Sequence, residues 1–138
     1  MKKVFADTCY WIAILNPKDT LHLKAKKVSE ELGPVFIVTS EMVLVELLNA
    51  FTERGEQFRN IASQMAEKIK LNPNCEVVPQ TSMQFNKALD RYKNRADKNW
   101  SITDCASILI MEEKKINDAL TYDDHFLQAG FIALLRDT

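Results

Sequence analysis

The sequence predicts an α/β fold of three layers, in which about five mainly parallel strands form a sheet with helices on both faces. Short apolar runs alternate along the chain with longer stretches of helical character, the pattern of strands joined by crossover helices. Only three glycines and four prolines occur in 138 residues. The chain is therefore expected to be compact and largely helical, without a repeat, a low-complexity tract or a linker.

The expected strands are the apolar runs at residues 3–6, 35–39, 76–78, 119–121 and 131–135. The expected helices between them cover residues 8–15, 20–32, 40–54, 57–71, 80–95 and 103–115. Four of these helices stop at helix-breaking residues, namely before Pro17, at Gly33-Pro34, at Gly55 and before Pro73.

The composition is that of an ordinary globular protein, with 46% hydrophobic and 27% charged residues, and we expect one domain over residues 1–138. No apolar stretch is long enough for a membrane span. The opening "MKKVFADT" places an aspartate where a signal peptide would have its apolar region. A cytoplasmic protein without membrane contact is expected.

The cysteines and the net charge exclude some kinds of site. Cys9, Cys75 and Cys105 are widely spaced among apolar residues, without a C-x-x-C pair, so reduced thiols are expected and a zinc site is not. The net charge of −1 gives no strong attraction to nucleic acid. The basic runs 23–27 and 90–98 are either solvated helix faces or contacts to phosphate.

Two aspartates follow expected strands. Asp7 ends the first strand in "VFADTCYW", and Asp123 follows the fourth in "ALTYDDHF". Each could simply cap the helix that comes next, because Asp is a favoured N-cap residue. Sites in parallel sheets lie at the carboxyl ends of strands, so both aspartates are also candidates for a functional site.

Two further acids lie on helices among apolar residues. Most residues three and four positions from Glu46 are apolar, which places Glu46 on the face expected to be buried. Asp104 opens a long uncharged stretch. A buried carboxylate is unfavourable unless it is paired or binds a metal. The alternatives are a salt bridge from Glu46 to a distant Lys or Arg, and a favourable interaction of Asp104 with the helix dipole, with Ser101 or Thr103 as the cap.

A parallel sheet could bring these four carboxylates to one edge. They would then repel one another and raise each other's pKa values unless a cation neutralised them. Oxygen ligands select hard ions, so Mg²⁺ or Mn²⁺ is expected rather than zinc. Such an ion is a common device for hydrolysing phosphodiesters. The chain has no P-loop and no G-x-G-x-x-G, which disfavours nucleoside triphosphate or dinucleotide chemistry.

In its order of acids the chain resembles the PIN-domain family, and within it the VapC-type toxins of bacterial toxin–antitoxin pairs. The stretches that carry the resemblance are "VLVELLNAF", "WSITDCAS" and "LTYDDHFLQAGF", and the match runs from Val4 to about Leu135. The resemblance implies a PIN-like fold and Mg²⁺- or Mn²⁺-dependent ribonuclease activity. It also implies a homodimer and inhibition by a small antitoxin protein.

By this resemblance the acidic quartet that binds the metal and carries catalysis is Asp7, Glu46, Asp104 and Asp123. Asp7 and Asp104 would be the most direct ligands.

The resemblance also implies supporting residues. Thr121 takes the position of a hydroxyl that often supports the water beside the metal, and Asn49, one helical turn after the quartet's glutamate, would line the same pocket. The T-x-D spacing favours the first aspartate of the "DD" pair over Asp124. Three further residues are weaker candidates for the site: Asp97, Asp124 and His125. For His125 the ordinary interpretation is a surface position or a local hydrogen bond.

Three functions are weighed. The favoured one is a metal-dependent endoribonuclease toxin that cleaves a structured tRNA or rRNA and blocks translation. The second is a PIN nuclease of RNA processing or maturation, or one acting on DNA. The third is a non-catalytic Mg²⁺-binding interaction module, which requires an acidic pair near the first strand where "VFADTCYW" has one acid.

Partner contacts are expected on two surfaces. Helices 40–54 and 57–71 carry more apolar residues than one buried stripe needs, which either fill the core or dock an antitoxin helix: Met42, Leu44, Leu47, Leu48, Phe51, Phe58, Ile61 and Met65. The candidate RNA-binding cations are Lys24, Lys27, Arg54, Lys93, Arg95 and Lys98. Aromatic side chains could stack on the bases of an RNA loop, with core packing as the alternative for the tryptophans: Trp11, Tyr92 and Trp100.

Overall fold

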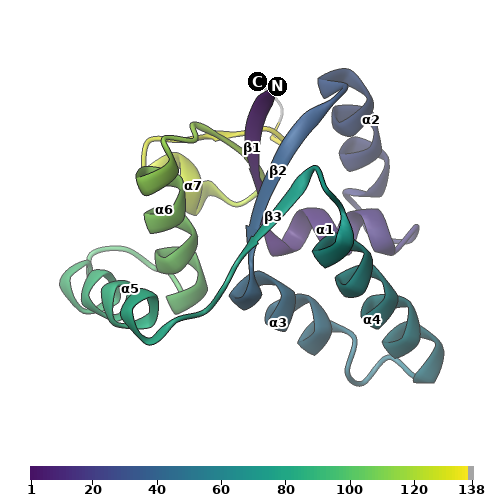
Figure 1. Ribbon diagram of the computed structural model, residues 1–138, viewed down its shortest axis with the longest axis horizontal. Coiled ribbons are helices and arrows are strands. Elements are labelled where there is room, and N and C mark those ends of the chain that lie inside the picture. The colour runs from purple at the N-terminus through teal and green to yellow at the C-terminus, as the bar shows by residue number, and fades with distance from the viewer. Residues whose placement is uncertain (137–138) are drawn as a thin grey trace.

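The computed structural model describes residues 1–136 and contains a five-stranded sheet between two groups of helices (Figure 1). The strand order is β3-β2-β1-β4-β5, and every pair of neighbours is parallel. The strands are β1 (Lys2–Ala6), β2 (Val35–Ser40), β3 (Cys75–Val78), β4 (Asp118–Leu120) and β5 (Ile132–Ala133). The predicted α/β class with a five-stranded parallel sheet is confirmed.

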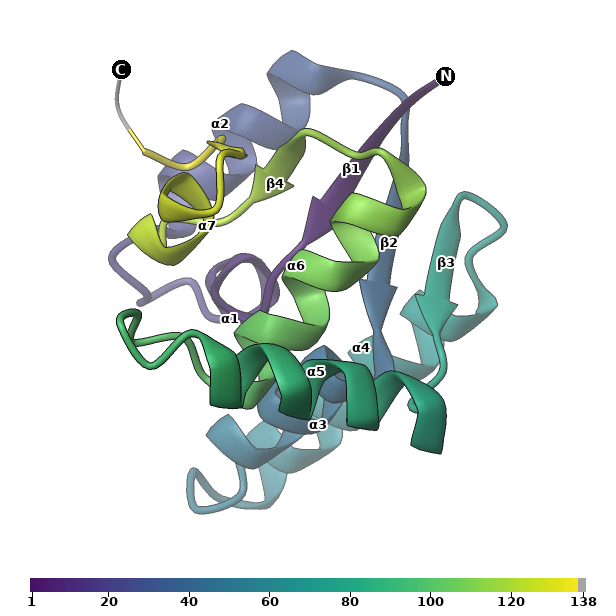
Figure 2. The ribbon, with the colours of Figure 1, turned by 90° about the vertical axis from the view of Figure 1, so that its left-hand side faces the viewer.

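Helices cover both faces of the sheet. The helices are α1 (Thr8–Leu15), α2 (His22–Leu32), α3 (Glu41–Ala50), α4 (Glu56–Leu71), α5 (Ser82–Asn94), α6 (Ile102–Lys114) and α7 (Asp124–Gln128). In two perpendicular views α5, α6 and α7 lie on one side of the strands and α1, α2 and α4 on the other (Figures 1 and 2). Helix α3 contacts both α1 and α6, so it lies where the two groups meet.

Hydroxyl side chains begin three of these helices. Ser40 accepts a hydrogen bond from the amide of Val43 at 3.1 Å and so begins α3 directly after β2. Thr81 begins α5 in the same way, and Ser101 begins α6. Each bond satisfies an amide that the first helical turn leaves without an intrahelical partner. Gly33, at φ 65°, ends α2 as the Gly-Pro pair predicted.

Two elements end two or more residues earlier than predicted. Helix α3 ends at Ala50 rather than residue 54, because Phe51 turns into the interior and stacks on Phe58 with ring centroids 5.3 Å apart. The last strand pairs over two residues only. After it, the amides of Leu134 and Leu135 still bond to carbonyls of β4 and the residue that follows β4, and the chain then turns.

The core lies on both sides of β1. Val4, Phe5 and Ala6 are all fully buried in succession, as expected for a central strand that is covered on both faces. Most of the surplus apolar residues of α3 and α4 also pack in or against the core, whereas Leu48 and Ile61 are more than one-third exposed. No helix in residues 1–136 is both long and apolar enough to cross a membrane.

Candidate active site

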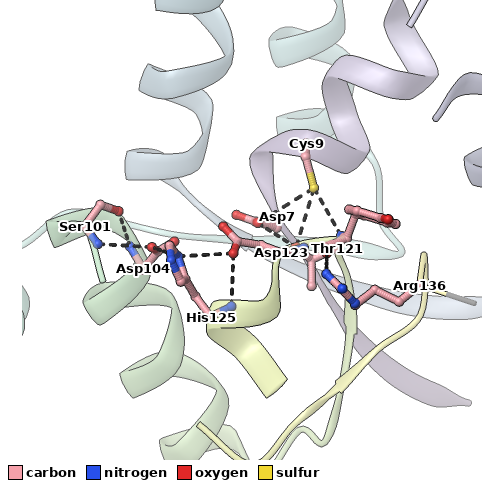
Figure 3. A network of polar contacts seen from close by, with 9 residues as sticks. Asp7, Cys9, Ser101, Asp104, Thr121, Asp123, His125 and Arg136 are labelled. Atoms are coloured by element: carbon pink, nitrogen blue, oxygen red, sulfur yellow. Dashed lines mark hydrogen bonds and ion pairs between the residues drawn. The ribbon is translucent and has the colours of Figure 1, made fainter. Parts of the chain in front are cut away.

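The site is built at the carboxyl ends of β1 and β4, which are neighbours in the sheet (Figure 3). The amide of Asp7 donates to the carbonyl of Leu120 at 3.2 Å and so continues the pairing of the two strands by one residue. As a result, the fully buried Thr121 hydroxyl donates to the Asp7 carboxylate at 2.9 Å. Thr121, predicted to support the site, therefore contacts Asp7 directly.

Asp7 occupies the N-cap position of α1, but its side chain makes no capping hydrogen bond. Capping therefore does not explain the carboxylate. The pKa of Asp7 is raised to about 7, mainly by burial and to a smaller extent by the negative charges of Asp104 and Glu46. Hydrogen bonds from the Thr8 amide and the Thr121 hydroxyl act against this rise. The influence of two other predicted acids on this pKa indicates that the three lie within electrostatic reach of one another.

Asp104 has two kinds of contact. Ser101 and Asp104 form a capping box at the start of α6, in which each side chain accepts a 3.0 Å hydrogen bond from the other's amide. The same carboxylate oxygen, Oδ2, lies 2.8 Å from Nδ1 of His125. Ser101 is the cap, as one of the two predicted candidates, and Asp104 contributes to the start of α6 while its carboxylate also contacts His125.

Asp123 caps the short helix α7 through a 3.0 Å hydrogen bond from the amide of His125, while its own amide donates to Thr121 Oγ1 at 3.1 Å. Asp124, the rival candidate, is the first residue of α7 and is exposed. Of the "DD" pair, the structure thus places Asp123 beside the other acids, as the T-x-D spacing favoured.

His125, ranked second from the sequence, joins these acids. Its Nδ1 lies 3.1 Å from Asp123 Oδ1 as well as 2.8 Å from Asp104 Oδ2. One ligand atom from each of the three residues falls within 4.8 Å of the others, a spacing that could hold a metal ion. Only the packing of α7 against α6 creates this cluster, so sequence spacing alone does not predict it.

Glu46 is half-buried on α3 and accepts a 2.5 Å hydrogen bond from the Thr8 hydroxyl at the start of α1. Within residues 1–136 no Lys or Arg forms an ion pair with it, so the distant salt bridge is not its explanation. Asn49 is exposed and lines a surface hollow with Ala50 and Arg54. The structure therefore does not bury Asn49 beside the acids.

Replacing Glu46 by Gln is expected to change the free energy of unfolding by less than about 1 kcal/mol, because the Thr8 hydroxyl can donate equally well to an amide oxygen. Urea denaturation of the two proteins measures this. A loss of about 3–5 kcal/mol would contradict the expectation, since that is the cost of leaving the basic partner of a buried ion pair unpaired.

The cluster of Asp104, Asp123 and His125, with Asp7 within electrostatic reach, has the chemistry of a divalent-cation site. Among the described residues no Lys or Arg side chain is ion-paired with Asp7, Asp104 or Asp123, so these carboxylates lack a permanent positive partner. Their oxygen atoms are ligands that hard divalent ions prefer. The pKa of Asp7 is raised because its carboxylate is buried without a positive partner.

The predicted RNA-contacting residues divide into surface and core. Trp11 is 7% exposed and donates from Nε1 to the Thr39 hydroxyl at 3.3 Å, so it is a core residue and its prediction as an RNA contact is wrong. Trp100 is 5% exposed and lies under the Arg95 guanidinium, 5.0 Å from its ring centroid. Lys93 is exposed and Lys98 half-buried, and both remain candidates.

A model of the PIN domain matches residues 4–132. The chain belongs to the PIN-domain family. The "23S rRNA-specific endonuclease VapC20" of Mycobacterium tuberculosis is 29% identical over 129 residues, which cover 94% of this chain and 95% of that protein. The predicted family and the resemblance to VapC proteins are thus confirmed.

Solved structures agree with this PIN fold. The crystal structure of M. tuberculosis VapC20, described as a toxin that cleaves the sarcin–ricin loop, superposes with a TM-score of 0.83 at 27% identity. It covers 94% of this chain and 96% of that one. FitAcB from Neisseria gonorrhoeae has a TM-score of 0.66 at 14% identity over 94% and 95% of the two chains, and shows the fold alone.

Other residues at this edge of the PIN domain were not predicted from the sequence. Cys9 accepts a 3.4 Å hydrogen bond from the Tyr122 amide and lies 3.5 Å from the Thr121 hydroxyl. Arg136 donates to the Tyr122 carbonyl at 2.6 Å, and its guanidinium lies 4.7 Å from the centre of the Tyr122 ring. Tyr122 itself is 45% exposed, so it places an open aromatic ring immediately before Asp123.

Proposed function

We propose that this PIN domain is the endoribonuclease toxin of a toxin–antitoxin pair and that its substrate is the sarcin–ricin loop of 23S rRNA. The observation that carries the proposal is the convergence of three acids: Asp7 and Asp123 meet at Thr121 where neighbouring strands end, and His125 joins Asp104 on α6 to Asp123. The similarity to VapC20 over nearly the full length of both chains supports the choice of substrate.

The residues divide the chemical work. Asp7, Asp104 and Asp123 would hold Mg²⁺ or Mn²⁺, with Glu46 completing the negative set. The ion would activate the attacking water and neutralise charge that develops on the phosphate in the transition state. Thr121 fixes the orientation of the Asp7 carboxylate, and Thr8 does the same for Glu46. The acids that bind the ion are thereby held in place before the substrate arrives.

Exposed aromatic rings and basic side chains suit the binding of a single-stranded RNA loop. Tyr122 and Tyr92 are 45% and 52% exposed, and unstacked bases can stack on such rings. Lys93 lies in the last turn of α5, and Lys98 lies between α5 and α6 together with Arg95, which is ion-paired with Asp97. These cations are the candidates for phosphate contacts. With a net charge of −1, a short loop fits better than extended binding to a duplex.

The partner and the location of the protein belong to the same proposal. An apolar pocket of about 440 Å³ lies between α1 and α4 and is lined by Ile14, Ile61 and Met65, among others. An amphipathic antitoxin helix could insert its apolar face there. We propose that the toxin is a homodimer in the cytoplasm, where both the antitoxin and the ribosome are available.

Short induction of the protein in cells is expected to create one sharp new 5′ end within the sarcin–ricin loop of 23S rRNA. Mapping of 5′ ends across total RNA measures this, with the Asp7→Asn variant as the control that should lack the new end. Cleavage at many unrelated sites would contradict the assignment to this loop. Equal cutting of double-stranded DNA and RNA by the pure protein would overturn the ribonuclease proposal itself.

A further inference from the structure

His125 lies between two of the acids that are proposed to hold the ion (Figure 3). Its backbone amide is bound by Asp123 Oδ1, which fixes the residue in the first turn of α7. Its ring nitrogen Nδ1 is then directed at Asp104 Oδ2, 2.8 Å away, and at Asp123 Oδ1, 3.1 Å away. Three ligand atoms from two different helices therefore face one small space.

A hydrogen bond from Nδ1 does not fully explain why two carboxylate oxygens lie close to this nitrogen. One N–H can donate a well-aligned hydrogen bond to one carboxylate oxygen, and here two anionic oxygens approach the same nitrogen. In the other tautomer the Nδ1 lone pair faces the same space as both oxygens. Only in this second tautomer can Nδ1 bind a cation, and a divalent cation among the three atoms would then neutralise the two carboxylates together.

The spacing also suits a six-coordinate ion. Two ligand atoms at right angles in an octahedral shell, with bonds of about 2.1 Å, lie about 3.0 Å apart. The separations of 2.8 and 3.1 Å from Nδ1 to the two oxygens are close to that value. Nδ1 is thus spaced from each oxygen as adjacent ligands of one shell are, and the ligand atoms of the three residues all lie within 4.8 Å of one another.

We propose that His125 Nδ1 is a direct ligand of the ion, so that this PIN domain has a mixed carboxylate–imidazole site with a preference for Mn²⁺ over Mg²⁺. The inference rests on the metal-dependent nuclease proposed above and adds a nitrogen ligand to its acids. Imidazole binds first-row transition metals well, whereas Mg²⁺ strongly prefers oxygen and gains little from it.

Pulsed electron paramagnetic resonance tests the ligand directly. The full-length protein is freed of metal with EDTA, loaded with less than one equivalent of Mn²⁺ and frozen. Electron spin-echo modulation from a directly bound ¹⁴N nucleus is expected in the wild type and not in His125→Asn. The asparagine amide can still hydrogen-bond to both carboxylates, so it preserves a purely positioning role while removing the imidazole nitrogen.

The other histidine of the chain provides a matched control. His22 lies on α2 and its Nδ1 is 2.7 Å from the Ala13 carbonyl, so His22→Asn should leave the nitrogen modulation unchanged. Titration should show that His125→Asn weakens Mn²⁺ binding by about tenfold or more and Mg²⁺ binding by less than about threefold.

Two results would overturn the ligand: no ¹⁴N modulation in the wild type, or modulation that persists in His125→Asn. Cleavage of the RNA loop by the same Mn²⁺-loaded protein is measured in parallel. Cleavage without nitrogen modulation would refute the ligand alone. Nitrogen modulation without cleavage would refute the nuclease proposal and leave the ligand standing.

Discussion

Replacing Asp7 or Asp104 by asparagine is expected to reduce RNA cleavage by roughly a thousandfold or more while the protein remains folded. Each change keeps the size of the side chain and removes one charge that would hold the proposed ion. An asparagine at position 7 could still accept the hydrogen bond from Thr121, and one at position 104 could still accept from the Ser101 amide. The loss should therefore appear in the catalytic rate rather than in stability.

Cleavage of a synthetic RNA loop under single-turnover conditions measures the rate, and thermal unfolding of the same samples measures stability. Asp90→Asn is a matched control, because Asp90 is an exposed aspartate on α5. It should cleave at the wild-type rate. If Asp104→Asn unfolded instead of losing activity, the capping box would be the main role of that carboxylate and its catalytic assignment would fail.

Without metal, the protein is expected to lose stability as the pH rises from about 4 to above 7. The Asp7 carboxyl has a pKa near its ordinary value of 3.8 when unfolded and about 7 when folded, mainly because of burial. Between these values the folded state binds more protons than the unfolded state, so the free energy of unfolding falls with rising pH. The protonated form of Asp7 is thus stable in the fold, and its ionised form is costly.

Urea denaturation in EDTA across this pH range measures the effect. Asp7→Asn should remove the part of the slope due to Asp7, and at pH 8 it should be more stable than the wild type by roughly 1–3 kcal/mol. Added Mn²⁺ should restore stability to the wild type at pH 8 and help the variant far less. Equal slopes in the two proteins would show that Asp7 is not the buried acid responsible.

The fold was largely predictable because its signals are local. Glycine and proline mark where α2 and α4 end, and the apolar runs correspond to β1 and β2 to within one residue at either end. The early end of α3 was not predictable, because it depends on Phe51 meeting Phe58 on another helix. The last strand was overestimated for a similar reason, since its apolar residues pack but do not all pair.

The acids of the site were predictable as carboxylates without a packing explanation, whereas their partners were not. The contact from Thr8 to Glu46 spans 38 positions, and that from Thr121 to Asp7 spans 114. Such pairs exist only once the strands are in register. Trp11 failed as an RNA contact because its position on α1 directs the ring inward, which its closeness to Asp7 in sequence does not reveal.

The junction between β1 and α1 consists of Asp7 alone, and this has a consequence for ion binding. The Asp7 amide is held by β4, and its carbonyl accepts from the amides of Tyr10 and Trp11, so the residue has almost no conformational freedom left. The entropy of arranging this ligand is lost when the chain folds, not when the ion arrives. The hydrogen bond from Thr121 also holds the carboxylate near the other acids, so affinity for the proposed ion and electrostatic repulsion in its absence would have the same origin.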